Sequence, residues 1–229
     1  MEIELINKTL SEKRFARYIQ RCEDDVEKAL KYYEFNSIMA QSCHIALESF
    51  EVILRNQIHN TFTRVFKTDE WYNVWLSSDK YSDFHKTIID TKEKLLHREE
   101  EIKPSKMIAE FTLGFWVRMF NNKYENLLWK PLRNAFVEMP KKKKKRGNVA
   151  KKLNKIRNFR NRISHYEPIS WNVDAMNKNY KNIYIVMNWF NSEYSDWVKE
   201  RSVFENVLKE QIEILKKLEI NKLDYNDQK

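Results

Sequence analysis

Residues 36–62, NSIMAQSCHIALESFEVILRNQIHNTF, decide the expected fold class. Apolar residues recur here at intervals of three and four, and no glycine or proline interrupts them, which is the pattern of an amphipathic helix. We therefore predict one long helix over this stretch. Its apolar positions are Ile38, Ala46, Leu47, Phe50, Ile53, Leu54, Ile58 and Phe62.

The composition of the whole chain favours the same fold class. Only two glycines and four prolines occur among 229 residues, whereas a β-sandwich, a Rossmann domain or a P-loop enzyme needs more turn glycine. Hydrophobic residues make up 42%, which is enough for a substantial core and excludes wholesale disorder although 33% of residues are charged. The chain is therefore predicted to be all-α.

Helical spacing and capping residues divide the rest of the chain into further elements. We find no strand alternation, internal repeat or long heptad run, so residues 1–229 are predicted to form one domain with its core over about 10–205. Gly114 lies within an expected helix and suggests close helix packing there. The expected helices cover about 11–19, 24–33, 82–101, 105–120, 124–136 with an interruption near Pro131, 149–167, 173–190, 193–200 and 201–219; a loop with a short helix covers 67–82, a basic loop 140–148, and a polar tail follows to 229.

The expected location is the cytoplasm. No apolar run approaches the ~20 residues that cross a bilayer, and the first residues lack the pattern of a signal peptide. Cys22 and Cys43 show neither metal-ligand nor redox spacing and are expected to be reduced thiols. We therefore expect no membrane partner.

The charge balance favours a polyanionic partner. The net charge is +9 and the isoelectric point about 9.3, which makes nucleic acid the first candidate. A run of cations within 140–148 either holds an RNA backbone or forms a solvated loop, and both interpretations stay open. The candidate RNA-binding residues are Lys141, Lys142, Lys143, Lys144, Lys145 and Arg146, together with Arg162 further along.

The most informative segment is KIRNFRNRISHYEP, residues 155–168. On a helix, Arg157, Asn161 and His165 stack at four-residue spacing. Arg160 lies five residues before His165, ~140° around the helix axis, and its long side chain can reach round the helix end. The pattern thus gathers a histidine, two arginines and an amide near a helix C-terminus.

These residue types suit the cleavage of RNA without a metal or other cofactor. Histidine titrates near neutral pH and can move the proton of the 2′-hydroxyl or protonate the leaving oxygen. Arginine stays charged and holds phosphate oxygens through parallel donors. Carboxylate clusters with two-metal nuclease spacing are missing from the sequence. From spacing alone, a histidine that merely complements the helix dipole remains the alternative.

The string RNRISHYEPI resembles the RNRIAHHEPI signature of Abi-like (abortive infection) proteins, members of the HEPN superfamily with its R-x(4–6)-H motif. Further pieces resemble that family in the same order, so the resemblance covers about residues 10–205. His165 is followed by Tyr166 where family members often have a second histidine. The other pieces are SEKRFARYI, ALKYYEFN, ESFEVILRNQIH, TLGFWVRMF and LLWKPLRNAF.

The resemblance implies an HEPN-type helical bundle with additional N- and C-terminal helices that often forms a homodimer. It implies a metal-independent endoribonuclease whose catalytic residues are Arg160, His165 and Asn161, and whose products carry cyclic phosphate and 5′-hydroxyl ends. It also implies a toxin of an abortive-infection or toxin–antitoxin phage-defence system. RNA would then be both the substrate and, as a small structured noncoding RNA, the antitoxin partner.

Supporting roles near the expected cleft are assigned to Arg157, Glu51, Arg55 and Asn56. Glu51 and Arg55 are four residues apart and can pair. They either orient Arg160 or His165 or form a structural salt bridge between helices, and both interpretations stay open.

Other candidates have plainer expected roles. His59 is expected to be exposed or structural, and Trp71, Tyr72 and Trp75 are expected to anchor the core rather than stack on bases. Two further functional hypotheses remain: an RNA-binding module that does not cut, and a chain in which Tyr166 is the target of a nucleotidyl transferase.

Overall fold

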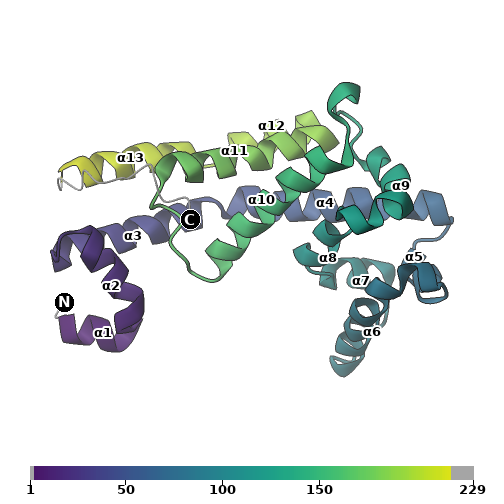
Figure 1. Ribbon diagram of the computed structural model, residues 1–229, viewed down its shortest axis with the longest axis horizontal. Helices are drawn as coiled ribbons and strands as arrows, with labels where there is room; N and C mark the ends of the chain where they lie inside the picture. Colours follow the sequence, from purple (N-terminus) through teal and green to yellow (C-terminus); the bar gives the residue numbers. More distant parts are fainter. Residues whose placement is uncertain (1–2, 218–229) are drawn as a thin grey trace.

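The computed structural model describes residues 3–217, and all regular secondary structure in this range is helical (Figure 1). The predicted all-α class is therefore confirmed. The α-helices are α1 (Ile3–Leu10), α2 (Glu12–Arg21), α3 (Val26–Ser42), α4 (His44–Phe66), α5 (Trp71–Leu76), α6 (Ser82–His97), α7 (Pro104–Glu110), α8 (Leu113–Arg118), α9 (Lys130–Leu132), α10 (Arg146–Ser164), α11 (Val173–Phe190), α12 (Ser192–Glu200) and α13 (Phe204–Lys217). Short 3-10 turns η1 (Asp79–Tyr81), η2 (Asn122–Tyr124), η4 (Arg133–Ala135) and η5 (Lys141–Lys143) and a π-helical turn η3 (Glu125–Trp129) lie between them.

The helices form an elongated arrangement around α3 and α4, which follow one another along the long axis (Figure 1). Helix α11 packs along α4, and α13 packs along α3. Helix α10 slants across the molecule and packs against α11 and α8. The pair α1–α2 covers one end of α3, while α5 to α9 gather around the far end of α4. None of the helices within residues 3–217 has the length and apolar character needed to cross a bilayer.

One continuous hydrophobic core extends from Ile6 in α1 to Leu215 in α13. Its densest aromatic part lies beside the C-terminal half of α4, where Trp71 and Trp75 are fully buried. The expected core role of Trp71, Tyr72 and Trp75 is thereby confirmed. His59 belongs to the same region, since its Nδ1 accepts a hydrogen bond from Trp71 Nε1 at 3.1 Å.

The predicted long helix over 36–62 is in fact parts of two helices, and this boundary prediction was wrong. Helix α3 begins at Val26 and ends at Ser42, and α4 starts at His44. At the break, Ser42 Oγ and Cys43 Sγ both donate to the carbonyl oxygen of Met39, at 2.8 and 3.3 Å. Such bonds from side chains to the preceding turn compete with the helical ladder and bend it.

The predicted apolar helix over 105–120 is also divided. Helix α7 begins at Pro104, and Phe111 after it is extended with φ −62° and ψ 128°. Thr112 then caps α8, because its Oγ1 accepts from the N–H of Phe115 at 3.3 Å. The suggested close packing at Gly114 is not observed: an added Cβ there would meet only Thr112 Oγ1, at 3.6 Å.

Helix α10 starts at Arg146, earlier than the predicted 149, so the basic loop is shorter than 140–148 and includes the turn η5. Helices α11, α12 and α13 follow close to their predicted bounds. The end of the predicted helix over 201–219 and the polar tail lie partly outside the described residues, which stop at 217.

Candidate active site

Helix α10 carries the motif and has two contrasting faces. Leu153, Ile156, Phe159 and Ile163 bury one face in the core. All charged residues of the helix are cations, and their spacing distributes them over the remaining surface: Arg146, Lys151, Lys152, Lys155, Arg157, Arg160 and Arg162.

Arg160 is held by a carboxylate from α4. Its Nε donates to Oε1 of Glu51 at 2.9 Å, and the two side chains are 38% and 29% exposed. Within residues 3–217 the two terminal nitrogens of this guanidinium have no hydrogen-bond partner. The pairing therefore fixes the side chain and leaves its outer donors available for an anion.

His165 lies at the C-terminal end of α10 and is exposed. The backbone N–H of His165 donates to the backbone carbonyl of Asn161 at 2.9 Å. Tyr166 then adopts φ 55°, and the N–H groups of Tyr166 and Glu167 donate to the carbonyls of Ile163 and Arg162, at 3.0 and 2.8 Å. This is a Schellman turn, which ends a helix by satisfying its last carbonyls. It leaves the imidazole on the outside of a well-defined helix end.

Arg162 helps to fix that turn, which differs from its expected role in RNA binding. Its guanidinium donates to the carbonyl of Pro168, and its Nε lies 3.5 Å from Oε2 of Glu167. These contacts bind the chain after the motif back to α10. Arg162 thus has a structural role in the turn, and its side chain is still 47% exposed.

Arg160 and His165 lie on different sides of α10. Five residues of helix separate them by about 140°. Among the described residues, no hydrogen bond joins the two side chains; Arg160 turns to Glu51 on α4 and His165 lies exposed. A phosphodiester that touches both groups would have to lie over the end of α10.

The remaining predicted site residues make no side-chain bonds to one another. Arg157 and Asn161 are half-buried, about two turns and one turn before the helix end, respectively, and Arg55 is half-buried on α4, whereas Asn56 is exposed. In the part of the chain that the structure describes, these four side chains have neither an ion pair nor a hydrogen bond. The suggested pairing of Glu51 with Arg55 is not observed, since Glu51 pairs with Arg160.

A pocket of about 380 Å³ lies next to the motif, between α3, the start of α4 and the end of α10. Glu34, Gln41 and His44 line it from one side, and Tyr166 and Glu167 from the other. The sequence analysis missed these α3 and α4 residues, because nothing local in the sequence shows that they lie beside a segment more than a hundred residues away.

Asn36 attaches the segment after the motif to α3. It is 5% exposed, and its Oδ1 accepts from Ile169 N, Ser170 N and Ser170 Oγ at 2.7, 3.1 and 3.0 Å. A buried amide oxygen with three donors fixes the path of the chain firmly. The segment 165–170 is therefore anchored on both sides of His165.

The lysines of residues 141–145 differ in their exposure to solvent. Lys141, Lys142, Lys143 and Lys145 are exposed, whereas Lys144 is half-buried, and burial followed by Arg133 and Lys141 lowers its pKa. None of the five forms an ion pair within residues 3–217.

Arg146 differs from the rest of the predicted RNA-binding set. Its guanidinium donates to Phe120 O, Glu125 Oε2 and Asn122 Oδ1 at 2.8, 2.8 and 3.0 Å, and the side chain is only 15% exposed. It fastens the start of α10 to the preceding turns.

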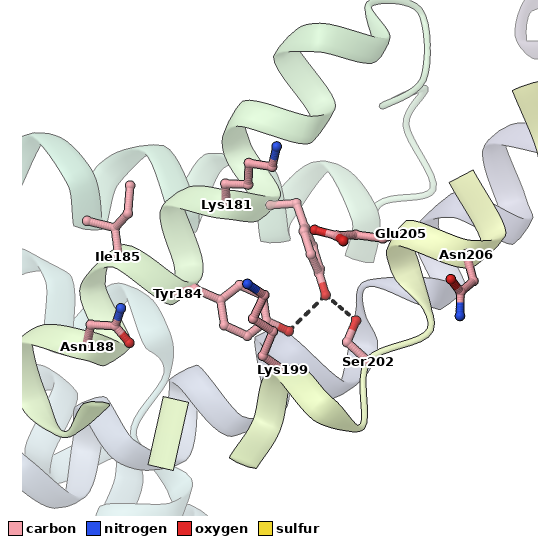
Figure 2. A pocket seen from close by; sticks show the side chains of 9 residues that line it. Lys181, Tyr184, Ile185, Asn188, Lys199, Ser202, Glu205 and Asn206 are labelled. Carbon is pink, nitrogen blue, oxygen red and sulfur yellow. Dashed lines mark hydrogen bonds between the residues drawn. The ribbon is translucent and has the colours of Figure 1, made fainter. Parts of the chain in front are cut away.

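A second pocket, of about 320 Å³, lies between α11 and the α12–α13 corner, away from the motif (Figure 2). Its polar centre is a chain of hydroxyl groups: Tyr180 bonds to Tyr184 at 2.8 Å and also to Ser202. Tyr180 stacks on Phe204, so these bonds attach α13 to α11. No motif residue lines this pocket, and the three hydroxyl groups at its centre bond to one another.

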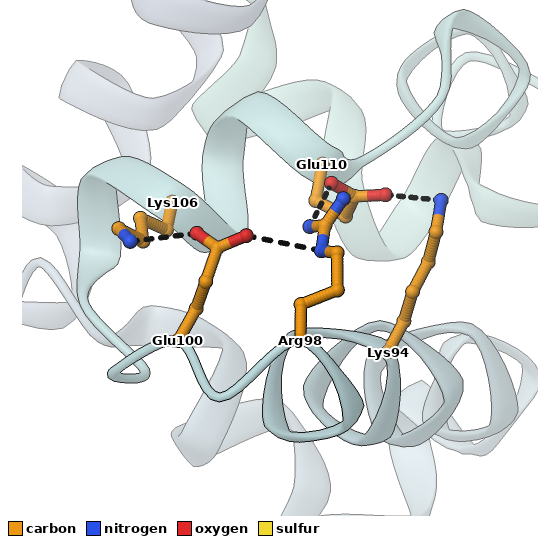
Figure 3. Close-up of polar contacts among 5 residues, drawn as sticks. All are labelled: Lys94, Arg98, Glu100, Lys106 and Glu110. Atoms are coloured by element: carbon orange, nitrogen blue, oxygen red, sulfur yellow. Dashed lines mark hydrogen bonds and ion pairs between the residues drawn. The ribbon is translucent and has the colours of Figure 1, made fainter.

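The polar cluster between α6 and α7 is also structural (Figure 3). Glu110 accepts from Lys94 and Arg98, and Glu100 pairs with Arg98 and Lys106 at 3.0 and 2.6 Å. These hydrogen bonds lower the pKa of Glu110 and Glu100. The alternation of charges ties the two helices together and leaves no group for chemistry.

Taken together, these residues define an all-α protein with a basic helix that carries a carboxylate-held arginine on one side and ends in an anchored, exposed histidine. Among residues 3–217, no three His, Cys, Asp or Glu side chains are grouped so that they could hold a metal. Comparison of the chain with models of protein families, with curated proteins and with solved structures gives no match.

Proposed function

We propose that this protein is a metal-independent endoribonuclease whose reacting groups are Arg160 and His165. One observation carries the proposal: the motif arginine on α10 is fixed by Glu51 of α4, and α10 itself ends at an exposed histidine. A structural arginine or a solvated histidine alone would not need this pairing of a positioned cation with an accessible proton carrier. The resemblance of RNRISHYEPI to the Abi-like signature supports the same chemistry.

In the proposed reaction, the 2′-oxygen of RNA attacks the adjacent phosphorus and the bond to the 5′-oxygen breaks. The free guanidinium nitrogens of Arg160 stabilise the charge that develops on the phosphate oxygens. His165 either accepts the proton of the 2′-hydroxyl or donates one to the leaving 5′-oxygen, and solvent exchanges the other proton. Asn161 supplies an amide donor near the sugar or phosphate. The products are a 2′,3′-cyclic phosphate and a 5′-hydroxyl.

The proposed biological role is that of a toxin in abortive infection, which acts as a homodimer and is restrained by a small structured RNA. This role rests on the resemblance to Abi-like proteins. The net charge of +9 supports a polyanionic partner but does not single out an antitoxin.

The test is an RNA-cleavage assay with the full-length chain in the presence of a chelator. We expect wild type to produce cyclic phosphate ends, and His165→Ala to cut at least about 100-fold more slowly, since a positioned acid or base contributes about 10²–10⁴ in rate. His97→Ala is the matched control, because His97 is an exposed histidine at the end of α6. Equal activity in folded His165→Ala and His97→Ala would remove the enzyme proposal.

A second candidate function is RNA binding without cleavage. It is favoured by the lack of contact between Arg160 and His165 and by the wholly cationic charge of α10. Under this alternative, the protein binds RNA with steep salt dependence but never generates new RNA ends.

A further inference from the structure

A basic pocket of about 340 Å³ lies on the N-terminal half of α10, away from the helix end that carries His165. Four lysines line it: Lys143 from the turn before the helix, and Lys151, Lys152 and Lys155 from α10 itself. Met139 and the 8%-exposed indole of Trp189 contribute apolar wall, and no carboxylate lines the pocket. Of these four lysines, only Lys143 is among the RNA-binding candidates predicted from the sequence.

Contacts within the protein hold the pocket in shape. Lys152 Nζ donates to Oδ1 of Asn182 at 2.7 Å, and the Asn182 amide donates back to the carbonyl of Lys152 at 3.1 Å. Asn148 Nδ2 donates to the carbonyl of Lys143 at 2.9 Å, which attaches the lysine turn to the first turns of α10. The four cations are thus gathered by structure and not only by composition.

The gathering is unfavourable in the absence of an anion. Lys151 and Lys155 are four residues apart, and like charges at this spacing destabilise a helix. Burial, and then the neighbouring Lys155, Lys151 and Lys143, lower the pKa of Lys152. A bound anion would relieve this repulsion.

The exposed surface of α10 that extends from the pocket indicates which kind of anion the pocket binds. Lys151, Lys155, Asn158 and His165 follow one another at intervals of four, three and seven residues, so they lie in one line along α10, and all are exposed. The 19 residues of α10 extend over about 28 Å, long enough to lie beside several nucleotides. No acidic residue occurs anywhere on this helix.

We propose that this lysine pocket binds a backbone phosphate of the RNA strand whose cleavage site lies at the other end of α10. The pocket thereby sets the register of the strand and takes no part in the chemical step. The proposal rests on the proposed function, because it takes the ligand to be the RNA that reaches His165.

The test measures binding of a fluorescein-labelled single-stranded RNA by anisotropy, in a His165→Ala background so that cleavage plays no part. The variant Lys151→Gln/Lys155→Gln removes two exposed charges of the pocket. The control Lys80→Gln/Lys86→Gln removes two exposed charges near the start of α6. The pocket variant should weaken binding and reduce the slope of log affinity against log salt by about 0.7, because the pocket contacts one phosphate and each single-strand phosphate contact contributes about 0.7. The control should match the parent.

An equal reduction of RNA affinity and salt slope in the two double variants would overturn the proposal, because the effect would then depend on total charge. No reduction in either variant would also overturn it, because the pocket would then not contact the RNA. Full displacement of the labelled RNA by millimolar inorganic phosphate at constant ionic strength would assign the pocket to free phosphate, and this result would also overturn the proposal. The outcome is independent of whether the wild type cuts RNA, so a failure of this site and a failure of the nuclease proposal can be told apart.

Discussion

Glu51 and Arg160 lie 109 positions apart in the sequence and meet through one hydrogen bond of 2.9 Å. The contact uses Nε of the arginine, and its terminal nitrogens have no hydrogen-bond partner among residues 3–217. In the proposed reaction Glu51 is a positioning residue: it touches Arg160 and does not contact the substrate. Its contribution should therefore show in the chemical step and not in the binding of RNA.

We predict that Glu51→Gln lowers kcat by about 10- to 100-fold with little change in KM, because a misplaced catalytic group costs up to about 10² in rate. The matched control is Glu48→Gln, an exposed carboxylate on the same helix. Single-turnover and steady-state cleavage rates measure both quantities. A rise in KM alone, or equal rates for the two variants, would show that the pair is only a structural salt bridge.

His59 illustrates a titratable residue with a structural role. Its Nδ1 must be unprotonated to accept from Trp71 Nε1, and burial lowers its pKa from the ordinary 6.5, with Asp69 acting in the opposite direction. Because the pKa in the folded state lies below the unfolded value, the unfolded chain binds more protons in the interval between the two. The stabilising contribution of His59 is thus present above about pH 6.5 and is lost as the pH falls.

We accordingly predict that wild type loses its stability advantage over His59→Gln as the pH is lowered from neutral to acidic values. Glutamine cannot titrate there and can still accept a hydrogen bond. Urea denaturation of both proteins across this pH range gives the difference in their free energies of unfolding. A difference that stays constant or grows on acidification contradicts the predicted sign.

At the scale of elements, the sequence predicted most helices well where a capping residue marks their start. Asn172 and Asn191 cap α11 and α12, accepting from Ala175 N and Tyr194 N at 2.7 Å each, and the predicted bounds of both helices lie within about one residue of those observed. The breaks at Cys43 and Phe111 were not predicted, because the apolar spacing of the sequence continues through both. Hydrogen bonds between nearby side chains and the backbone interrupt the helix at these points.

The candidate site was predictable only in part. The residues of α10 follow from one local pattern, and Glu51 could be suggested because it forms, with Arg55 and Asn56, a polar insertion in an apolar helix. The roles of Arg146 and Arg162 could not be predicted, since their acceptors include the backbone carbonyls of Phe120 and Pro168, which no sequence pattern displays. The pocket lined by α3 was also invisible, because it depends on tertiary packing.

Helix α10 offers a direct test of its own geometry. Gly147 lies in its first turn, and an added Cβ would meet no atom within 4 Å. We predict that Gly147→Ala stabilises the protein by about 0.5–1 kcal/mol, because alanine loses less backbone entropy than glycine in a helix. Chemical denaturation measures the change. A destabilised variant would show that Gly147 is not helical or that the site is more crowded than the structure indicates.

Considered as a whole, the molecule places its most basic helix obliquely across the long axis defined by α3 and α4 (Figure 1). One half of α10 contributes to the lysine pocket, and the other half ends at the proposed reacting groups. In the proposed function, the binding element and the cutting element for a strand of RNA thus lie on one helix.

The most direct test of the central claim is a double-mutant cycle of Arg160→Ala and His165→Ala, measured as single-turnover RNA cleavage. If both groups act on one phosphodiester, each single variant loses at least about 100-fold, and the double variant is scarcely slower than the slower single one, because residues that act as a unit are strongly non-additive. Losses that multiply independently, or a single variant with wild-type rate, would contradict the account.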